Sequence, residues 1–88
     1  MHPTLRPVRR GEFIQNFGER VRAKRTGCGW TQEDLAHASG LHRTMIGHVE
    51  QGTRNATLET IEKLARALQV QPAELMPPIA FQRRGRTR

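Results

Sequence analysis

The stretch at residues 31–50, TQEDLAHASGLHRTMIGHVE, constrains the fold of this 88-residue chain more than any other part. Apolar or small side chains recur through it at helical spacing: Leu35, Ala36, Ala38, Leu41, Met45, Ile46 and Val49. Thr31 is a good N-cap, because its hydroxyl can accept a hydrogen bond from a free backbone N–H. Gly40 tolerates a positive φ, so a second helix can leave at a steep angle. The stretch predicts two short helices, 32–39 and 43–51, joined by a tight turn.

Two helices joined in this way form a helix-turn-helix. The run TQEDLA, followed by Gly40, Ile46 and Val49, resembles the motif of lambdoid phage repressors and of the Cro/C1-type (XRE) regulator family. Within that family the run LHRTMIGHVEQGTRN looks most like the controller proteins of restriction–modification systems, which often have Tyr where this chain has Met45. The resemblance covers about residues 17–76. It implies an all-α fold, a compact bundle of about five short helices with a central helix-turn-helix, like the lambda-repressor DNA-binding domain.

Helical patterns flank the motif on both sides. A first helix is expected at 12–25, with Gly27 as its stop. Its buried stripe should hold Phe13, Ile14, Phe17 and Val21. A fourth helix is expected at 58–69, with Thr57 as its cap. Its buried stripe should hold Leu58, Ile61, Leu64, Ala65 and Leu68. A short fifth helix should begin at Pro72 and end near residue 76, before Pro77 and Pro78.

The net charge of +7 lies at the two ends of the chain. Residues 1–11 carry +3 and residues 77–88 carry +4, whereas residues 12–76 sum to zero. The chain therefore divides into a basic N-terminal arm, a neutral domain and a basic C-terminal tail. The arm and the tail can attract DNA phosphates without reading sequence, or they can serve only as solubilising ends. The candidate contacts there are Arg9, Arg10, Arg83 and Arg84.

Several other classes of protein do not fit the sequence. No apolar run has the length of a membrane span, and prolines interrupt the N-terminus where a secretory signal would lie. The single cysteine, Cys28, excludes an intramolecular disulfide and fits a reducing cytoplasm. No Gly-rich phosphate loop follows a strand, and the four histidines lack the spacing of a zinc site. We therefore expect no metal, no cofactor, no small-molecule ligand and no enzymatic activity.

The second motif helix has two faces on a helical wheel. Met45, Ile46 and Val49 share one side, and the opposite side carries the candidates for direct base readout. These candidates are Arg43, Thr44, Gly47 and His48. The outward face of such a helix enters the major groove of DNA. Arg43 is the strongest candidate, because its planar fork matches the O6/N7 edge of guanine. Gly47 lowers helix stability, which a close approach of its backbone to DNA would explain; the alternative is that it is simply tolerated.

A second set of residues is expected to contact the DNA backbone: Gln32, His42, Gln51, Arg54 and Asn55. Gln32 begins a helix whose free N–H groups can face a phosphate, and it matches a backbone-contacting position in the family. Arg54 and Asn55 also match such positions. His42 stands where Ser, Thr or Asp would cap the helix better, so either the helix start is less stable or His42 turns toward DNA. The alternatives for Gln32 and Arg54 are a plain helix start and a solvated loop charge.

The expected partners are double-stranded DNA and a second copy of the chain. One recognition helix contacts too few base pairs to be selective, and the resemblance implies two-fold pairing on a palindromic operator. The candidate interface residues are Leu75, Met76, Ile79 and Phe81. An alternative hypothesis is an antitoxin that uses the same domain, with the C-terminal tail folding on a toxin. The sequence does not distinguish an activator from a repressor.

Overall fold

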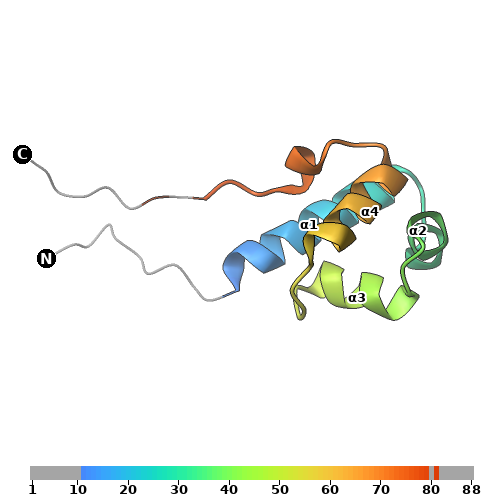
Figure 1. The fold of residues 1–88 in the computed structure, drawn as a ribbon, viewed down its shortest axis with the longest axis horizontal. Helices are drawn as coiled ribbons and strands as arrows, with labels where there is room; N and C mark the ends of the chain where they lie inside the picture. The colour runs from blue at the N-terminus through green and yellow to red at the C-terminus, as the bar shows by residue number, and fades with distance from the viewer. Residues whose placement is uncertain (1–10, 80, 82–88) are drawn as a thin grey trace, which may run out of the picture.

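The computed structural model describes residues 11–79 and residue 81. In this part the chain forms α1 (Glu12–Gly27), α2 (Gln32–Ser39), α3 (Arg43–Gln51), α4 (Leu58–Leu68) and the 3-10 helix η1 (Pro72–Leu75) (Figure 1). No strand occurs among these described residues. α3 packs on α1, α2 contacts α3 and α4, and η1 closes on α4 and α1. The predicted all-α fold with a central helix-turn-helix is confirmed, although the fifth helix is a 3-10 turn.

The two motif helices begin and end where the sequence predicts. The Thr31 hydroxyl accepts a hydrogen bond from the Asp34 N–H (3.0 Å), and the Asp34 carboxylate accepts one from the Thr31 N–H (2.8 Å). This capping box satisfies two N–H groups at the helix start that have no partner within the helix. Gly40 has φ 77°, the left-handed conformation that turns the chain sharply into α3.

α1 extends beyond its predicted end at Arg25 and includes Gly27. The N–H groups of Cys28 and Trp30 both bond to the Arg25 carbonyl, which closes the end of the helix. The left-handed residue there is Gly29, with φ 75°. The prediction that Gly27 stops the helix is therefore wrong. A glycine at position 27 or at position 29 could form this turn. The turn at Gly29 is followed directly by Trp30, which packs against the core.

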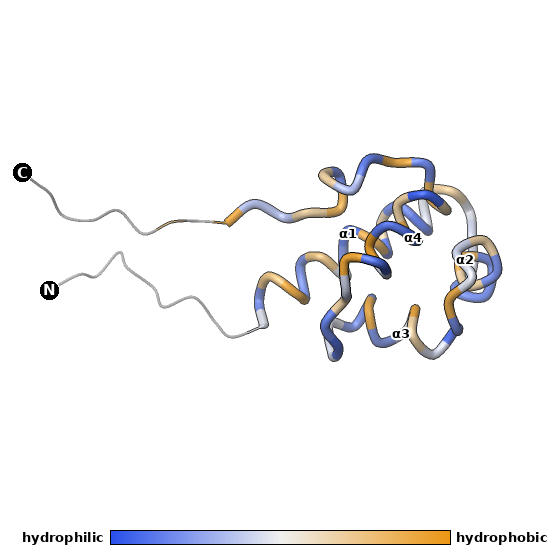
Figure 2. The backbone as a smooth tube through the Cα atoms, in the orientation of Figure 1, coloured by the Kyte–Doolittle hydropathy of each residue, from blue (hydrophilic) through white to orange (hydrophobic). Residues whose placement is uncertain are grey.

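The hydrophobic core draws on all the helices. It consists of Phe17, Val21, Leu35, Ile46, Val49, Leu64, Ala65, Leu68 and Leu75. α2, α3 and α4 have 8, 9 and 11 residues. Isolated helices shorter than about 12 residues are marginal in water, so packing on this core supplies most of the stability of these three. Figure 2 shows hydrophobic positions recurring along the helices that enclose the core.

Three apolar residues lie elsewhere than the sequence predicts. Leu58 is 84% exposed, because Thr60, whose N–H bonds to the Thr57 hydroxyl (3.0 Å), takes the inward side of the first turn of α4. Phe13 is 39% exposed, since the first turn of α1 projects beyond the other helices (Figure 1). Leu75, expected at a subunit interface, has no exposed surface. Leu75 therefore belongs to the core of the protomer, and its assignment to the interface is corrected.

α1 and α3 approach closely at Gly18. A Cβ atom at this position would lie 2.8 Å from the carbonyl oxygen of Glu50 and closer still to that of Val49. Both oxygens belong to the backbone of α3, so no rotation of a side chain could make room. Gly18 therefore sets how closely α3 sits on α1, a role that the helical pattern of the sequence does not reveal.

Candidate nucleic-acid interface

α3 presents its two faces as the wheel predicts. Ile46 and Val49 are fully buried, and Met45 is half-buried against the core. On the other side, Arg43, Thr44 and Gln51 are exposed. The burial of the apolar face fixes the orientation of the helix, because turning it would expose that face to water. The exposed side chains near the start of α3 are consequently held outward on a rigid element.

The start of α2 lies beside the outward face of α3. A Cβ atom on Gly47 would be 3.9 Å from Oε1 of Gln32, which is ordinary van der Waals contact. Gln32 is half-buried, and its Nε2 donates a hydrogen bond to Oε1 of Glu50 (3.1 Å). Gln32 therefore has a fixed side-chain orientation beside the candidate reading residues. Two of the predicted contacts, one from each motif helix, form one continuous surface.

The partner of Gln32 belongs to a buried ion pair that connects three elements. Glu50 accepts hydrogen bonds from Nε (2.6 Å) and Nη2 (3.0 Å) of Arg25, a paired geometry that planar guanidinium favours. Arg25 also donates from Nη1 to the Trp30 carbonyl (2.7 Å). The two side chains are only 10% and 2% exposed. The pair ties α3 to the end of α1 and, through Gln32, to the start of α2.

The hydrogen bond with Glu50 and the attraction of its charge raise the pKa of Arg25, against the opposing effect of burial. A raised pKa means that Arg25 contributes stability at every pH below its unfolded pKa, and that this contribution is lost only as the pH rises through the folded value. Sequence reasoning did not identify this pair. The signal was present, since Glu50 follows Ile46 by four residues and so shares the inward side of α3.

His48 is tied to the end of its own helix. Its Nδ1 lies 3.1 Å from the Thr53 hydroxyl oxygen, and its backbone carbonyl accepts a hydrogen bond from the Thr53 N–H (3.1 Å). His48 as a whole residue is half-buried. Contact with a base would therefore use Nε2, the ring nitrogen that Thr53 does not occupy. Thr53 was not a candidate residue from the sequence, and its hydroxyl holds the orientation of one that was.

The remaining candidates flank α3 at its two ends. His42 occupies the N-cap position with extended backbone and makes no side-chain cap hydrogen bond, and it is exposed. Arg54 and Asn55 are exposed in the loop after α3. Gly52 starts this loop with φ 72°, and a Cβ atom there would lie 2.8 Å from the Gln15 Cα. The loop thus leaves α3 in close contact with α1. Arg9, Arg10, Arg83 and Arg84 lie outside the described residues.

Arg43 and Arg54 have no carboxylate partner among the described residues, and neither do Arg20 and Arg22 on α1. Four other basic side chains form ion pairs with carboxylates: Lys24, Arg25, Lys63 and Arg66. An exposed guanidinium without an anionic partner is available to phosphate or to a guanine edge. The charge available on this surface therefore comes from the two arginines that bracket α3.

Other kinds of site find no support in the part of the chain that the structure describes. Residues 11–79 and 81 contain no group of three or more His, Cys, Asp or Glu side chains placed to hold a metal ion. No helix in these ranges is both long enough and apolar enough to cross a bilayer. Cys28 is exposed in the loop between α1 and α2.

We expect the substitution Gly47→Ala to separate stability from DNA binding. It should raise the free energy of unfolding by up to about 1 kcal/mol, because alanine has a higher helix propensity than glycine. The added methyl group also fits beside Gln32. The same methyl group should weaken DNA binding if the α3 backbone approaches a base closely. Urea denaturation and fluorescence anisotropy on one preparation would measure both. A variant that binds DNA as tightly as the parent would contradict a close approach at Gly47.

A helix-turn-helix that turns a polar, cationic face outward defines a DNA-binding regulator domain. The sequence model described as helix-turn-helix matches residues 21–75. The chain belongs to this family, the Cro/C1-type (XRE) transcription regulators.

Its relatives include controller proteins. The chain is 48% identical over 61 residues to Control protein C.BamHI of Bacillus amyloliquefaciens, covering 68% of this chain and 75% of that protein. It is 48% identical over 60 residues to Control protein C.SmaI of Serratia marcescens, covering 68% and 71%. The crystal structure of the restriction-modification controller protein C.AhdI from Aeromonas hydrophila matches with a TM-score of 0.70 and 49% identity, over 72% of this chain and 96% of that chain. The resemblance to controller proteins is confirmed.

Proposed function

We propose that this protein is a sequence-specific transcription regulator that binds a palindromic operator as a homodimer and controls a restriction–modification system. The observation that carries the proposal is the outward face of α3 with Gln32 beside it, together with two exposed arginines, Arg43 and Arg54, that have no carboxylate partner among the described residues. The similarity to controller proteins adds the biological setting. None of the relatives named above is an antitoxin, and no observation favours the toxin–antitoxin alternative.

Two-fold pairing follows from how little DNA one domain can read. The outward side chains near the start of α3 are few, and each bidentate base contact contributes only about 1–3 kcal/mol of discrimination. Two copies related by a two-fold axis would present their α3 helices to half-sites about one helical turn, or 34 Å, apart. The operator should therefore be a palindrome with this spacing.

Arg43 and Arg54 should have separable roles in binding. Arg43→Ala should cost about 1–3 kcal/mol on the matched operator and relax the preference at one base position, since a guanine contact is lost. Arg54→Ala should weaken binding to all DNA sequences alike, since a phosphate contact is lost. It should also reduce the slope of log binding constant against log salt concentration by about one. Anisotropy titrations on a matched operator and on single-mismatch operators, each at several salt concentrations, would measure both effects. Identical behaviour of the two variants would contradict this division of roles.

Selection of binding sites from a random duplex library at near-physiological salt tests the proposed function directly. A two-fold symmetric site, with half-site centres about ten base pairs apart, should be enriched. Salt-sensitive binding without any enriched sequence would contradict the proposal, because it would mean that charge alone holds the protein on DNA. A parallel selection with the Arg43→Ala variant should lose information at one position in each half-site.

A further inference from the structure

A shallow apolar groove of about 200 Å³ lies between the first turns of α1, the segment before α4 and the end of η1. Its apolar lining is Phe13, Ile14, Phe17, Ala56, Ile61 and Met76. Pockets for small molecules have volumes of about 300 Å³ or more. The groove is smaller than this and has the lining of a packing surface, so it suits one or two apolar side chains.

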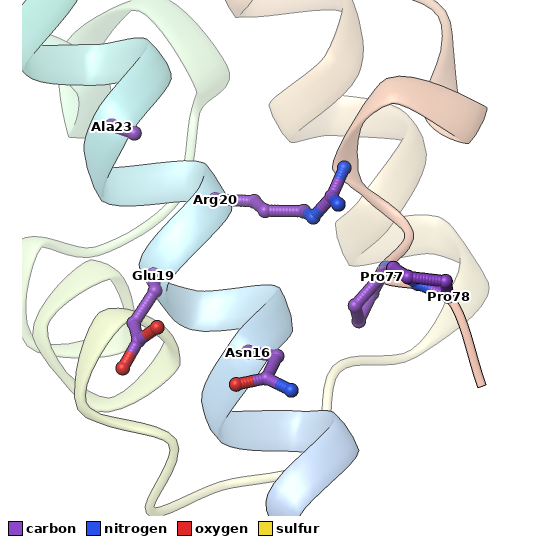
Figure 3. Close-up of a pocket in the computed structure, with 6 residues that line it drawn as sticks. All are labelled: Asn16, Glu19, Arg20, Ala23, Pro77 and Pro78. Atoms are coloured by element: carbon purple, nitrogen blue, oxygen red, sulfur yellow. The ribbon is translucent and has the colours of Figure 1, made fainter. Parts of the chain in front are cut away.

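The chain leaves the domain beside this groove. Met76 lines it, and Pro77 and Pro78 follow. Pro77 is buried next to α1, where Arg20 donates a hydrogen bond to the Glu74 carbonyl (3.4 Å). Figure 3 shows Arg20 reaching across from α1 toward the segment that carries the two prolines. Each proline fixes its own φ and keeps the residue before it extended, so the exit direction is set by covalent geometry as well as by contacts.

Two large apolar side chains follow the prolines without cover. Ile79 is 60% exposed and Phe81 is 86% exposed. They stand two residues apart, so an extended chain would place both on one side. The two residues between Pro78 and Phe81 are Ile and Ala, and neither favours a reverse turn. Neither Ile79 nor Phe81 lines the groove of its own domain.

We propose that Ile79 and Phe81 of one copy fill the groove of a second copy, so that two chains exchange their C-terminal segments. The inference rests on the proposed homodimer and names a contact for it. Because the exchange is two-fold symmetric, the same groove and the same segment are used in both directions. The partner buries the apolar surface of Phe13 and Ile61 together with that of the incoming segment, which is the driving force for association.

The test uses the full chain with Cys28→Ser and Gln82→Cys, which carries a nitroxide spin label at position 82. This ¹⁴N protein is mixed in equal amounts with ¹⁵N protein that carries no label, so that only contacts between copies can broaden the ¹⁵N signals. We expect the amide signals of Phe13, Ala56 and Ile61 to be broadened. Broadening found only when label and ¹⁵N share a chain would overturn the exchange, because the tail would then cover its own groove. Absence of broadening would also overturn it, and would leave the groove to the N-terminal arm or to solvent.

The double variant Ile79→Ser with Phe81→Ser is the matched control. Both side chains are exposed, so the domain should keep its fold, which circular dichroism verifies. With the same spin label, this variant should lose the broadening between copies. Its dimer, measured by sedimentation equilibrium, should dissociate about tenfold more easily or more. An unchanged dimer with unchanged broadening would overturn the role of these two side chains.

Failure of this inference can be told from failure of the proposed function. A palindromic operator bound by a dimer that shows no broadening between copies would overturn the exchange and leave the function standing. A protein that stays monomeric at the same concentration, with and without operator DNA, would overturn both.

Discussion

Replacement of Glu50 by alanine should lower the free energy of unfolding by about 3–5 kcal/mol. The substitution removes the carboxylate that accepts two hydrogen bonds from Arg25, whose side chain is 10% exposed. A guanidinium left in that position has neither water nor a counter-charge, and the cost of its desolvation is no longer offset. Urea denaturation followed by circular dichroism would measure the loss.

The structure offers a matched control for this substitution. Glu62→Ala breaks the pair with Arg66 on the surface of α4, where the two side chains are 57% and 78% exposed, and should change stability by less than about 0.5 kcal/mol. The double variant Arg25→Met with Glu50→Leu should recover most of the loss, because it removes both buried charges at once. A Glu50→Ala loss no larger than that of Glu62→Ala would contradict the weight given to the buried pair.

Glu50→Ala should also weaken operator binding by the folded protein. Gln32 donates its side-chain hydrogen bond to Glu50, so loss of the carboxylate releases a residue expected to contact the DNA backbone. Binding measured well below the denaturation midpoint should therefore show a loss on all operator sequences alike. Loss of preference at one base position alone would instead indicate that the substitution disturbs the base-reading side chains of α3.

The substitution Gly18→Ala should be the second most damaging change, with a loss of about 3 kcal/mol or more. The new Cβ atom would meet backbone carbonyls of α3, so relief requires α3 to move as a whole. Gly27→Ala is the control within the same helix, because a Cβ atom there has no neighbour within 4 Å. It should stabilise α1 by up to about 1 kcal/mol. Thermal denaturation of both variants would measure the contrast, and equal effects would exclude a special role for Gly18.

The features that sequence predicts best are those that a few neighbouring residues determine. The N-cap Thr31 and the left-handed Gly40 depend on short-range chemistry, and both are found where expected. The two faces of α3 follow from helical spacing alone. Leu58 fails the same test, because Thr60 takes the inward side of the first turn of α4. Phe13 fails it because no local pattern shows that the first turn of α1 projects beyond the other helices.

The parts of the candidate site that sequence missed are contacts between distant residues. Arg25 and Glu50 are 25 residues apart, and the helical spacing that places Glu50 on the inward side of α3 does not show that Arg25 is its partner. From the sequence, Gly18 is only a residue of low helix propensity within α1. Its role depends on the backbone of α3, which lies directly against it. The role of Thr53 comes from its hydroxyl, which lies beside the ring of His48. These residues position the predicted reading surface, and the contacts with DNA stay predictions.

Asn55 lines the apolar groove and also stands in the loop that is expected to meet DNA phosphates. A segment from a second copy in that groove would therefore border the loop that is expected to hold the domain on its operator. Any ordering of the loop by one ligand lowers the entropic cost of the other, and thermodynamic linkage requires the two effects to be equal. DNA should then strengthen self-association as much as self-association strengthens DNA binding. Occupancy of the operator would rise steeply over a narrow range of protein concentration, which is the behaviour of a threshold switch.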